Sequence, residues 1–200
     1  QNHGRGVTNV SVIKRLAVLP FENLGSPEDE YFADGMTDEI RGKLSTIPAL
    51  QVTASSSAST YKGSSKSTRE IAKELGVDYV LVGKIRWEKG QGGQSRVRVS
   101  PELINVAKAS VEWQQPFDAA LTDVFQVQAE VATKVAAALN LALSQGQQLQ
   151  LVTKPTNNLP AYDAYLRGNE AAAGLFATTT NDLRQAIGFY ERAVALDSTF

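Results

Sequence analysis

The chain has 200 residues, 42% of them apolar and 20% charged, which suits one ordinary domain with an appendage or two small domains. Its net charge is −1, from 20 basic and 21 acidic residues, so the sequence lacks the positive excess of a nucleic-acid binder. It contains no cysteine, which excludes disulfides, cysteine-ligated zinc and thiol catalysis.

The first third of the sequence predicts two strands around a helix. Residues 1–13 begin polar and Gly-rich, and we expect a disordered leader there. Residues 15–21 are a compact apolar run that predicts a buried strand, and Ser26-Pro27 marks a helix start. Residues 50–54 predict a second strand, and residues 55–67 a serine-rich loop. The helix has one apolar face that ends before Pro48 and consists of Phe32, Met36, Ile40, Leu44 and Ile47.

The middle of the sequence predicts a short helix and a β-hairpin. Ser67 and Glu70 have the spacing of a capping box and Gly76 is a helix stop, so we expect a helix over 68–75. Strands are predicted over 77–88 and 96–104, joined by a glycine loop at 90–93. Pro101 predicts a bulge or an edge position in the second strand.

The remaining elements are mostly helical. Residues 105–108 predict a turn, 110–117 a strand and 122–143 a long helix. Residues 144–160 are Gln-rich, contain two prolines and predict a linker. Helices are expected over 161–175 and 181–196, separated by a small-polar loop at 177–180.

The last predicted helix carries an apolar stripe. The stripe comprises Leu183, Ala186, Ile187, Tyr190, Ala193, Val194 and Leu196, and it ends four residues before the chain does. Such a stripe needs neighbours to cover it. We therefore expect the sequence to be part of a longer protein in which a helical repeat array continues.

Several blocks of the first part resemble one family. In chain order they are LAVLPFENLG, DEYFADGMTDEIRGKLSTIPAL, YKG, REIAKELGVDYVLVGKIR and RVRVSPELI. Together they resemble the TolB amino-terminal-like domain of large bacterial signalling proteins, over residues 14–143. Pro101 and the glycine-free turn near Asn105 depart from the pattern and concern the local hairpin geometry. The resemblance implies a mixed sheet with helices on one side and no established catalytic residues.

The end of the chain resembles a tetratricopeptide repeat (TPR). Tyr165, Leu166 and Gly168 match its first helix. Ala186, Tyr190 and Ala193 match its second helix, where small residues let the two helices approach closely. The loop between the helices is about six residues longer than in the usual repeat of about 34 residues. Ser198 stands where a proline usually ends the second helix.

The expected fold class is α+β. We expect a mixed sheet of about five strands with helices on one face, followed by an all-α, TPR-like hairpin. The expected divisions are a disordered leader at 1–13, the TolB-like domain at 14–143, a linker at 144–160 and the first TPR-like hairpin at 161–200.

No catalytic or metal site is predicted, and no cofactor. His3 is the only histidine and lies in the leader, so no histidine activates the serines of the folded part. The glycines at 90–93 join two strands, whereas a phosphate loop joins a strand to a helix. An acidic cluster lies around a predicted helix start, where the helix dipole favours negatively charged side chains. A Mg²⁺ or Ca²⁺ site is the alternative interpretation. The cluster consists of Glu28, Asp29, Glu30, Asp34, Asp38 and Glu39.

Three binding surfaces are considered. Trp87 and Trp113 with nearby arginines (Arg86, Arg96, Arg98) suggest a stacking platform for nucleic acid, but packing is favoured because the charge is balanced. A small-molecule groove on a sheet face without helices is an alternative. The outer residues of the last helix are expected to contact a partner or a second copy of the chain; they are Leu183, Ile187, Val194 and Leu196.

The favoured function is a non-catalytic interaction or scaffold module of a multidomain bacterial signalling protein, whose TPR part binds a protein or peptide. The alternatives are a small-molecule sensor for a nucleotide, sugar or cell-wall fragment, and an enzyme such as an adenylate cyclase. The resemblance implies a place after a Ser/Thr kinase or winged-helix domain, often beyond one membrane helix. The segment would then be periplasmic, and otherwise cytoplasmic; no nucleic acid and no membrane insertion are expected within it.

Overall fold

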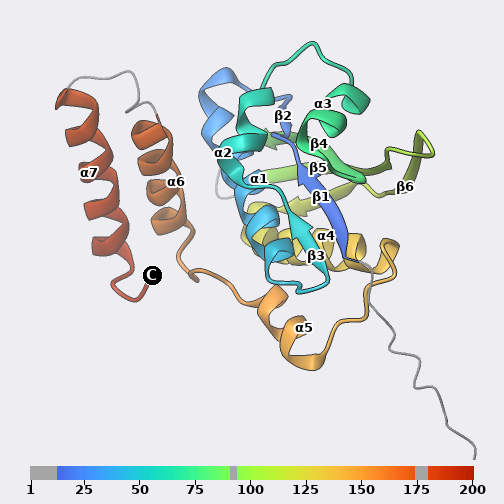
Figure 1. The fold of residues 1–200 in the computed structure, drawn as a ribbon. Coiled ribbons are helices and arrows are strands. Elements are labelled where there is room, and N and C mark those ends of the chain that lie inside the picture. The colour runs from blue at the N-terminus through green and yellow to red at the C-terminus, as the bar shows by residue number, and fades with distance from the viewer. Residues whose placement is uncertain (1–12, 91–93, 174–179) are drawn as a thin grey trace, which may run out of the picture.

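The computed structural model describes residues 13–90, 94–173 and 180–200, and shows a sheet wrapped by helices with a helical hairpin beside it (Figure 1). The strands are β1 (Lys14–Val18), β2 (Glu22–Asn23), β3 (Leu50–Val52), β4 (Tyr79–Glu88), β5 (Arg96–Asn105), β6 (Ser110–Gln114) and β7 (Phe117–Ala120). The α-helices are α1 (Glu30–Ser45), α2 (Ser55–Ala58), α3 (Thr68–Leu75), α4 (Val124–Ala138), α5 (Gln145–Val152), α6 (Leu159–Ala173) and α7 (Thr180–Leu196). Short 3-10 helices are η1 (Pro27–Asp29), η2 (Ser59–Tyr61) and η4 (Leu121–Asp123). The predicted α+β class is confirmed.

The sheet is mixed and follows the order β3-β1-β4-β5-β6. β1 pairs in parallel with β3 on one side and with β4 on the other, whereas β4 and β5 form a long antiparallel hairpin. The short strands β2 and β7 pair with the far halves of β4 and β5. Within the described part of the chain the sheet therefore has seven strands, where about five were expected.

The sheet is interrupted on both sides of the β4–β5 hairpin at the same level. β1 pairs with β4 as far as Leu81 and β2 resumes at Lys84, with Pro20 in the break. On the other side, β7 pairs with β5 as far as Val99 of β5, and the pairing of β5 with β6 begins at Glu102 of β5. Pro101 pairs with Gly83 inside the hairpin but has no strand opposite it on its outer side. This explains how a residue without an N–H stands in a central strand.

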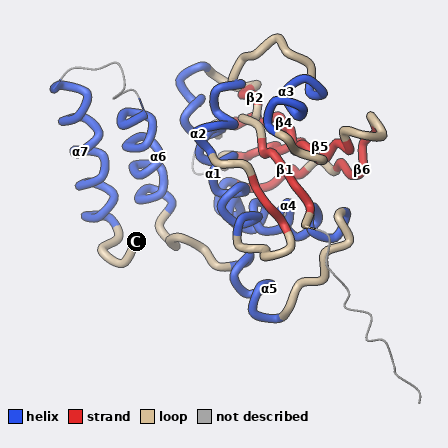
Figure 2. Tube along the Cα trace, in the orientation of Figure 1, coloured by secondary structure: helices blue, strands red, loops and turns tan. Residues whose placement is uncertain are grey.

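The two faces of the sheet are covered unequally. The larger core lies between one face and helices α1 and α4, and it includes Leu16, Val18, Leu81 and Leu103. A smaller cluster packs Ala58 and Ile71, from α2 and α3, against the other face. Figure 2 shows the long helices α1 and α4 behind the strands and the short α3 in front of them. Helices thus cover one face fully and part of the other.

The strand predicted over 110–117 is split in two. β6 ends at Gln114 and β7 begins at Phe117. Gln115 and Pro116 stand between them, and Pro116 cannot donate a backbone hydrogen bond to β5. The loop predicted over 55–67 likewise contains α2 and η2.

The long helix predicted over 122–143 ends at Ala138, and the predicted linker contains α5. Asn140 adopts a left-handed conformation with φ 55°, and the Leu141 N–H donates to the Ala136 carbonyl, as in a helix C-cap. In α5, Leu151 is fully buried. The Lys43 ammonium of α1 donates to the carbonyls of Leu151 and Thr153 at 2.7 and 2.9 Å. The segment over 144–160 is thus tied to the body of the protein.

Two predicted features fall partly outside the described residues. All of the leader except residue 13 lies there, and so does His3. So do residues 91–93 of the glycine loop and most of the 177–180 loop. The pairing of β4 with β5 nevertheless confirms the predicted hairpin.

The capping box of α3 is present as predicted. The Ser67 hydroxyl accepts from the Glu70 N–H, and the Glu70 carboxylate accepts from the Ser67 N–H. Ser67→Ala is expected to lower the free energy of unfolding by about 1 kcal/mol, because the Glu70 N–H loses its acceptor, the Ser67 hydroxyl. Urea denaturation measures the change. Ser65→Ala, an exposed serine of the preceding loop, is the control, and equal losses in both variants would contradict the role of the cap.

Candidate functional site

The helical hairpin of α6 and α7 brings together most of the predicted TPR-packing residues. Ala186 and Ala193 are buried. The Gly168 backbone lies directly under the Tyr190 ring, since a Cβ at Gly168 would stand 2.6 Å from Tyr190 Cε1. The Tyr190 hydroxyl donates to Asn169 at 2.9 Å. Small residues in both helices therefore allow the close approach that the sequence pattern predicts.

The other two predicted packing residues lie elsewhere on α6. Tyr165 packs edge-on against Phe200, with ring centroids 5.2 Å apart, and its ring lies 6.3 Å from that of Tyr190. Leu166 turns away from α7 and packs on Gly35 of α1. Its role in the hairpin is thus corrected, because it joins α6 to the body of the protein.

The base of the hairpin is tied by side chains that precede α6. Asn158 caps the start of α6 by accepting from the Ala161 N–H at 3.1 Å. The same side chain donates to the Leu196 carbonyl at the end of α7, at 2.9 Å. Thr156 donates to Asp197 just beyond α7. These bonds fix where α7 ends relative to where α6 begins.

Helix α6 docks on α1 and α4 through apolar contacts. Leu166 fills the space above Gly35, where a Cβ would lie 2.7 Å from Leu166 Cδ1. Tyr162 packs edge-on against Phe125 of α4, with centroids 4.8 Å apart. Its hydroxyl accepts a bond of 3.1 Å from the buried side chain of Gln128.

A polar clasp continues this contact. The Tyr31 hydroxyl of α1 donates to Asp163 at 2.5 Å and accepts from Arg167 at 2.9 Å. The Arg167 guanidinium also lies 4.4 Å from the centroid of the Tyr31 ring. Burial and the bond to Asp163 raise the pKa of Tyr31 above its usual value. Tyr31 therefore stays a neutral donor that links α1 to α6.

The outer face of α7 carries an apolar stripe that nothing in the described structure covers. The α7 stripe, as we call it, consists of Leu183, Ile187 and Val194, which are 45%, 46% and 57% exposed. In Figure 1 α7 lies beyond α6, on the side of the hairpin away from the sheet. Leu196, also predicted for this face, is 39% exposed but follows Leu183 by thirteen residues, which turns it far from the stripe around the helix.

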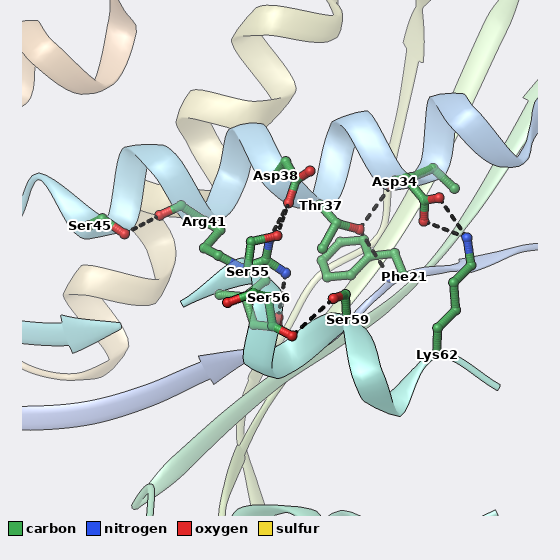
Figure 3. Close-up of polar contacts among 12 residues, drawn as sticks. Phe21, Asp34, Thr37, Asp38, Arg41, Ser45, Ser55, Ser56, Ser59 and Lys62 are labelled. Atoms are coloured by element: carbon green, nitrogen blue, oxygen red, sulfur yellow. Dashed lines mark hydrogen bonds and ion pairs between the residues drawn. The ribbon is translucent and has the colours of Figure 1, made fainter. Parts of the chain in front are cut away.

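A polar crevice lies between α1, the α2–η2 segment and α6. It has a volume of about 230 Å³, and its walls include Asp34, Asp38, Lys62, Asn169 and Glu170. In Figure 3, Lys62 reaches across from the end of η2 to Asp34 on α1. The Lys62 ammonium lies 2.6 Å from Asp34 and 3.0 Å from Glu30. The crevice thus joins the sheet-bearing part of the chain to the hairpin.

Arg41 forms the inner end of this crevice. Its side chain is buried, and its guanidinium donates to the Val18 carbonyl at the end of β1, at 2.8 Å. It also binds Asp38 and, at 2.9 Å, the Ser55 hydroxyl (Figure 3). Arg41 therefore holds α1, β1 and α2 together at the carboxyl end of the parallel strands, where open α/β sheets commonly bind ligands.

The carboxylates of the crevice are partly desolvated. Burial is the main cause that raises the pKa of Asp34, and Lys62 opposes it. Burial also raises the pKa of Glu170; the Arg167 charge opposes this rise, and the nearby Asp34 and Glu30 carboxylates add to it. The crevice is therefore a place where a negative charge is costly.

Glu170→Gln is expected to raise the melting temperature at pH 7, because it removes a partly desolvated charge beside two carboxylates. The folded pKa of Glu170 lies above its ordinary value of 4.5, so the folded state binds the proton more readily. The ionised Glu170 therefore lowers the stability of the folded state at pH 7. This loss disappears as the pH falls through the raised pKa towards 4.5 and the carboxylate is protonated. Thermal unfolding is measured at pH 7 and near pH 4.5. The difference in melting temperature between the variant and the original chain should be smaller at the lower pH. Glu88→Gln, on an exposed strand position, is the control, and an advantage that does not depend on pH would contradict the assignment.

A second hollow lies on the sheet face that α1 and α4 leave free. It has a volume of about 500 Å³ and sits over the aligned strand breaks, with Lys84, Ser100, Glu102 and Gln114 among its walls. The sequence alternative of a groove on the uncovered sheet face corresponds to this hollow.

The acidic cluster is mostly ion-paired. Lys89 lies 2.6 Å from the buried Asp29, Lys62 binds Glu30 and Asp34, and Arg41 binds Asp38. Within 13–90, 94–173 and 180–200, no group of three or more acidic or histidine side chains is arranged to hold a metal ion. Glu28, Asp29 and Glu30 of the cluster stand in the first turns of η1 and α1, where the helix dipole favours acidic side chains.

The tryptophans do not form a stacking platform with the arginines. Trp87 packs on Phe32 of α1, with centroids 4.8 Å apart. Arg86 neighbours Trp87 in β4 and so points to the opposite face of the sheet. Arg96 and Arg98, on that other face, both bind Asp118.

The sequence did not identify the clasp or the crevice. In the clasp, Tyr31 lies 132 residues before Asp163 and 136 residues before Arg167 in the sequence. No local sequence pattern connects residues so far apart. A weak signal was present, because Asp163 and Arg167 have the i, i+4 spacing of a helical ion pair.

The comparison with protein families identifies the body of the chain. Residues 13–134, more than half of the 200, match the model of the HilA/YgeH-like transcriptional regulator, second domain. The chain belongs to this family. The match runs from the start of β1 into α4, so the HilA/YgeH-like region contains the sheet, the Arg41 end of the crevice and the α1 half of the clasp. It ends before α6, and the TPR resemblance of the hairpin therefore stays a prediction.

A curated relative extends beyond the HilA/YgeH-like region. It is a protein of Rhizobium meliloti (strain 1021) named "Putative adenylate cyclase 3", 34% identical over 173 residues. The match covers 86% of this chain but only 29% of the relative. The chain thus spans less than a third of the length of this relative.

Solved structures similar to the HilA/YgeH-like region are more distant. TolB from Acinetobacter baumannii is 16% identical, with a TM-score of 0.46 over 63% of this chain and 28% of that one. The PelC dodecamer from Paraburkholderia phytofirmans is 19% identical, with a TM-score of 0.45 over 66% of this chain and 91% of its own. Lipoprotein GNA1162 from Neisseria meningitidis is 16% identical, with a TM-score of 0.44 over 62% and 98%. Separately, no helix among the described residues is long and apolar enough to cross a bilayer.

Proposed function

We propose that the chain is a non-catalytic protein-interaction module of a multidomain bacterial signalling protein, and that the α6–α7 hairpin binds a protein or peptide partner. The observation that carries the proposal is the α7 stripe, three large apolar side chains about half exposed on one side of a well-packed helix. Contiguous apolar surface of this kind marks an interaction site. Membership in a family of regulator domains and a much longer relative support a part within a larger protein.

The setting of the module is part of the proposal. The resemblance to TolB-like segments favours a place after a kinase or winged-helix domain, and the HilA/YgeH-like match favours a transcriptional regulator. In the membrane-anchored arrangement the module is extracytoplasmic, and in the other it is cytoplasmic. The hairpin then presents its surface to a partner while the sheet-bearing part holds it in place through the clasp.

Peptide selection tests the proposal. A displayed peptide library is selected against residues 1–200 and counter-selected against the double variant Ile187→Asp/Val194→Asp. We expect enriched peptides with apolar residues at helical spacing, as when an amphipathic helix is recognised in a groove. Gln185→Asp, an exposed polar position of α7, is the control and should retain the peptides. Failure to enrich any stripe-dependent peptide argues against the proposal, and so does conversion of ATP to cyclic AMP by the purified chain.

A second function, small-molecule sensing, is favoured by the crevice. It lies at the carboxyl ends of parallel strands and has walls from both the sheet-bearing part and α6. A ligand that binds there only in the folded state raises the melting temperature. A thermal-shift screen of nucleotides, sugars and cell-wall fragments, repeated with Lys62→Ala and Asn169→Ala, separates this function from the first.

A further inference from the structure

Together with the half-buried Tyr190, the α7 stripe has the spacing of a coiled-coil seam. Leu183, Ile187, Tyr190 and Val194 follow one another at intervals of four, three and four residues. This is the alternation with which two helices interlock side chains along one seam. Ile187, Tyr190 and Val194 also line one shallow apolar groove together with Glu191 and Ala195.

The two sides of this seam differ in what they offer to a partner helix. On one side, Ala186 and Ala193 are already buried against α6. On the other side stand Arg184 and Glu191, seven residues apart and both exposed. Neither takes part in any of the ion pairs found among the described residues. The free side of the seam thus carries one positive and one negative charge, one near each end.

This arrangement of charges is self-complementary in one orientation only. If a second α7 lies antiparallel, with the two-fold axis between Gly188 and Phe189, Leu183 meets Val194 of the partner subunit and Ile187 meets Tyr190 of the partner subunit. Arg184 then lies on the same side of the seam as Glu191 of the partner subunit and within about 3 Å of it along the helix axis, and the contact occurs at both ends of the pair. In a parallel two-fold pair the free sides of the two helices lie on opposite sides of the seam, so Arg184 and Glu191 of the partner subunit do not meet across it.

We propose that the α7 stripe, together with Tyr190, is a homodimer interface, in which the α7 helices of two copies of the chain pack antiparallel along Leu183, Ile187, Tyr190 and Val194. The inference rests on the proposed function, because it names the partner of the same surface. α7 has 17 residues and is about 26 Å long. One helix pair of this length buries less than the roughly 1,200–2,000 Å² of a standard interface. The dimer is therefore weak, with a dissociation constant on the order of tens of micromolar.

Charge reversal tests the orientation. Sedimentation velocity is recorded from about 5 to 500 μM, a range that brackets the expected dissociation constant. Arg184→Glu and Glu191→Arg should each shift dimer formation to a several-fold higher protein concentration, because each places like charges near one another across the pair. An equimolar mixture of the two variants restores opposite charges at both positions and should dimerise like the original chain. Arg192→Glu, on the side of α7 away from the seam, is the control and should leave dimerisation unchanged.

Cross-linking tests the register. The chain has no cysteine, so Leu183→Cys and Val194→Cys each introduce a single thiol. Oxidation of the mixed variants should give the disulfide between the two different positions. Each variant alone should give little dimer, since identical positions lie about 16 Å apart along an antiparallel pair, far beyond disulfide reach.

The outcomes separate this inference from the proposed function. A chain that stays monomeric at every concentration overturns the homodimer, and stripe-dependent peptides from the library would still support the interaction module. Dimerisation that ignores the charge reversals, or same-position disulfides, also overturns the antiparallel arrangement. Dimerisation that follows the reversals supports the inference even where the library yields no peptide.

Discussion

Replacing Gly35 with valine is expected to release the α6–α7 hairpin from the body of the protein. A Cβ at Gly35 would lie 2.7 Å from Leu166 Cδ1 and 3.1 Å from Leu166 Cγ, and Leu166 is itself buried. Overpacking of this kind costs about 1–3 kcal/mol. Since the clasp consists of only a few hydrogen bonds around Tyr31, we expect it to break when Leu166 is displaced.

Hydrogen exchange measures this release. Amides of α6 and α7 should exchange faster in Gly35→Val, while those of β4 and β5 keep their protection. Gly42→Val is the matched control, because Gly42 lies on the same helix and nothing stands within 4 Å of its Cβ position. Equal exchange in the two variants would show that Leu166 does not hold the hairpin in place.

Replacing Gly168 with valine is expected to separate α7 from α6. The added Cβ would lie 2.6 Å from Tyr190 Cε1 and 2.7 Å from Cδ1, and an aromatic ring cannot bend away as an aliphatic chain can. The variant should lose about 1–3 kcal/mol of stability within the hairpin. It should also lose every stripe-dependent interaction, because α7 is not held in a helix without its partner.

Limited proteolysis and peptide binding check this result. Cleavage within residues 180–196 should become faster, and binding at the α7 stripe should fall. Gly188→Val lies in α7 with no atom within 4 Å of the new Cβ, so it should leave both unchanged. Intact binding in Gly168→Val would mean that the stripe acts without the hairpin.

Local signals predicted much of the fold. The capping box at Ser67 and the left-handed Gly76 gave the bounds of α3, because both act within a few residues. The β4–β5 hairpin followed from two runs of strand residues around glycines, and α1 from one apolar face. The α+β class needed no more than this order of elements.

Other boundaries depended on less obvious signals. Asn140 ends α4 by taking a left-handed conformation, which Asn tolerates better than most residues, so the stop was visible in principle. Pro116 divides the strand predicted over 110–117 because it has no backbone N–H to donate to β5. α5 was missed because its Gln-rich sequence is only weakly amphipathic, and its position depends on Lys43 from a distant helix.

The candidate sites divide in the same way. The small residues of the hairpin and the exposed α7 stripe follow a periodic pattern, so the sequence located them. The clasp and the crevice join α1, η2 and α6, and their distance in sequence hides them. Leu166 shows the limit of the repeat pattern, because its neighbour is Gly35 and not α7.

The aligned breaks beside β4 and β5 give the sheet a mechanical character. Where β1 gives way to β2 and β6 to β7, only the antiparallel ribbon of Gly83 and Pro101 crosses the middle. Gly83 has no side chain to stiffen the ribbon, and the Phe21 ring fills the space beside it. The sheet therefore consists of two halves that are joined only by strands β4 and β5. A twist of one half is transmitted to the other through these two strands and through the helices packed against them.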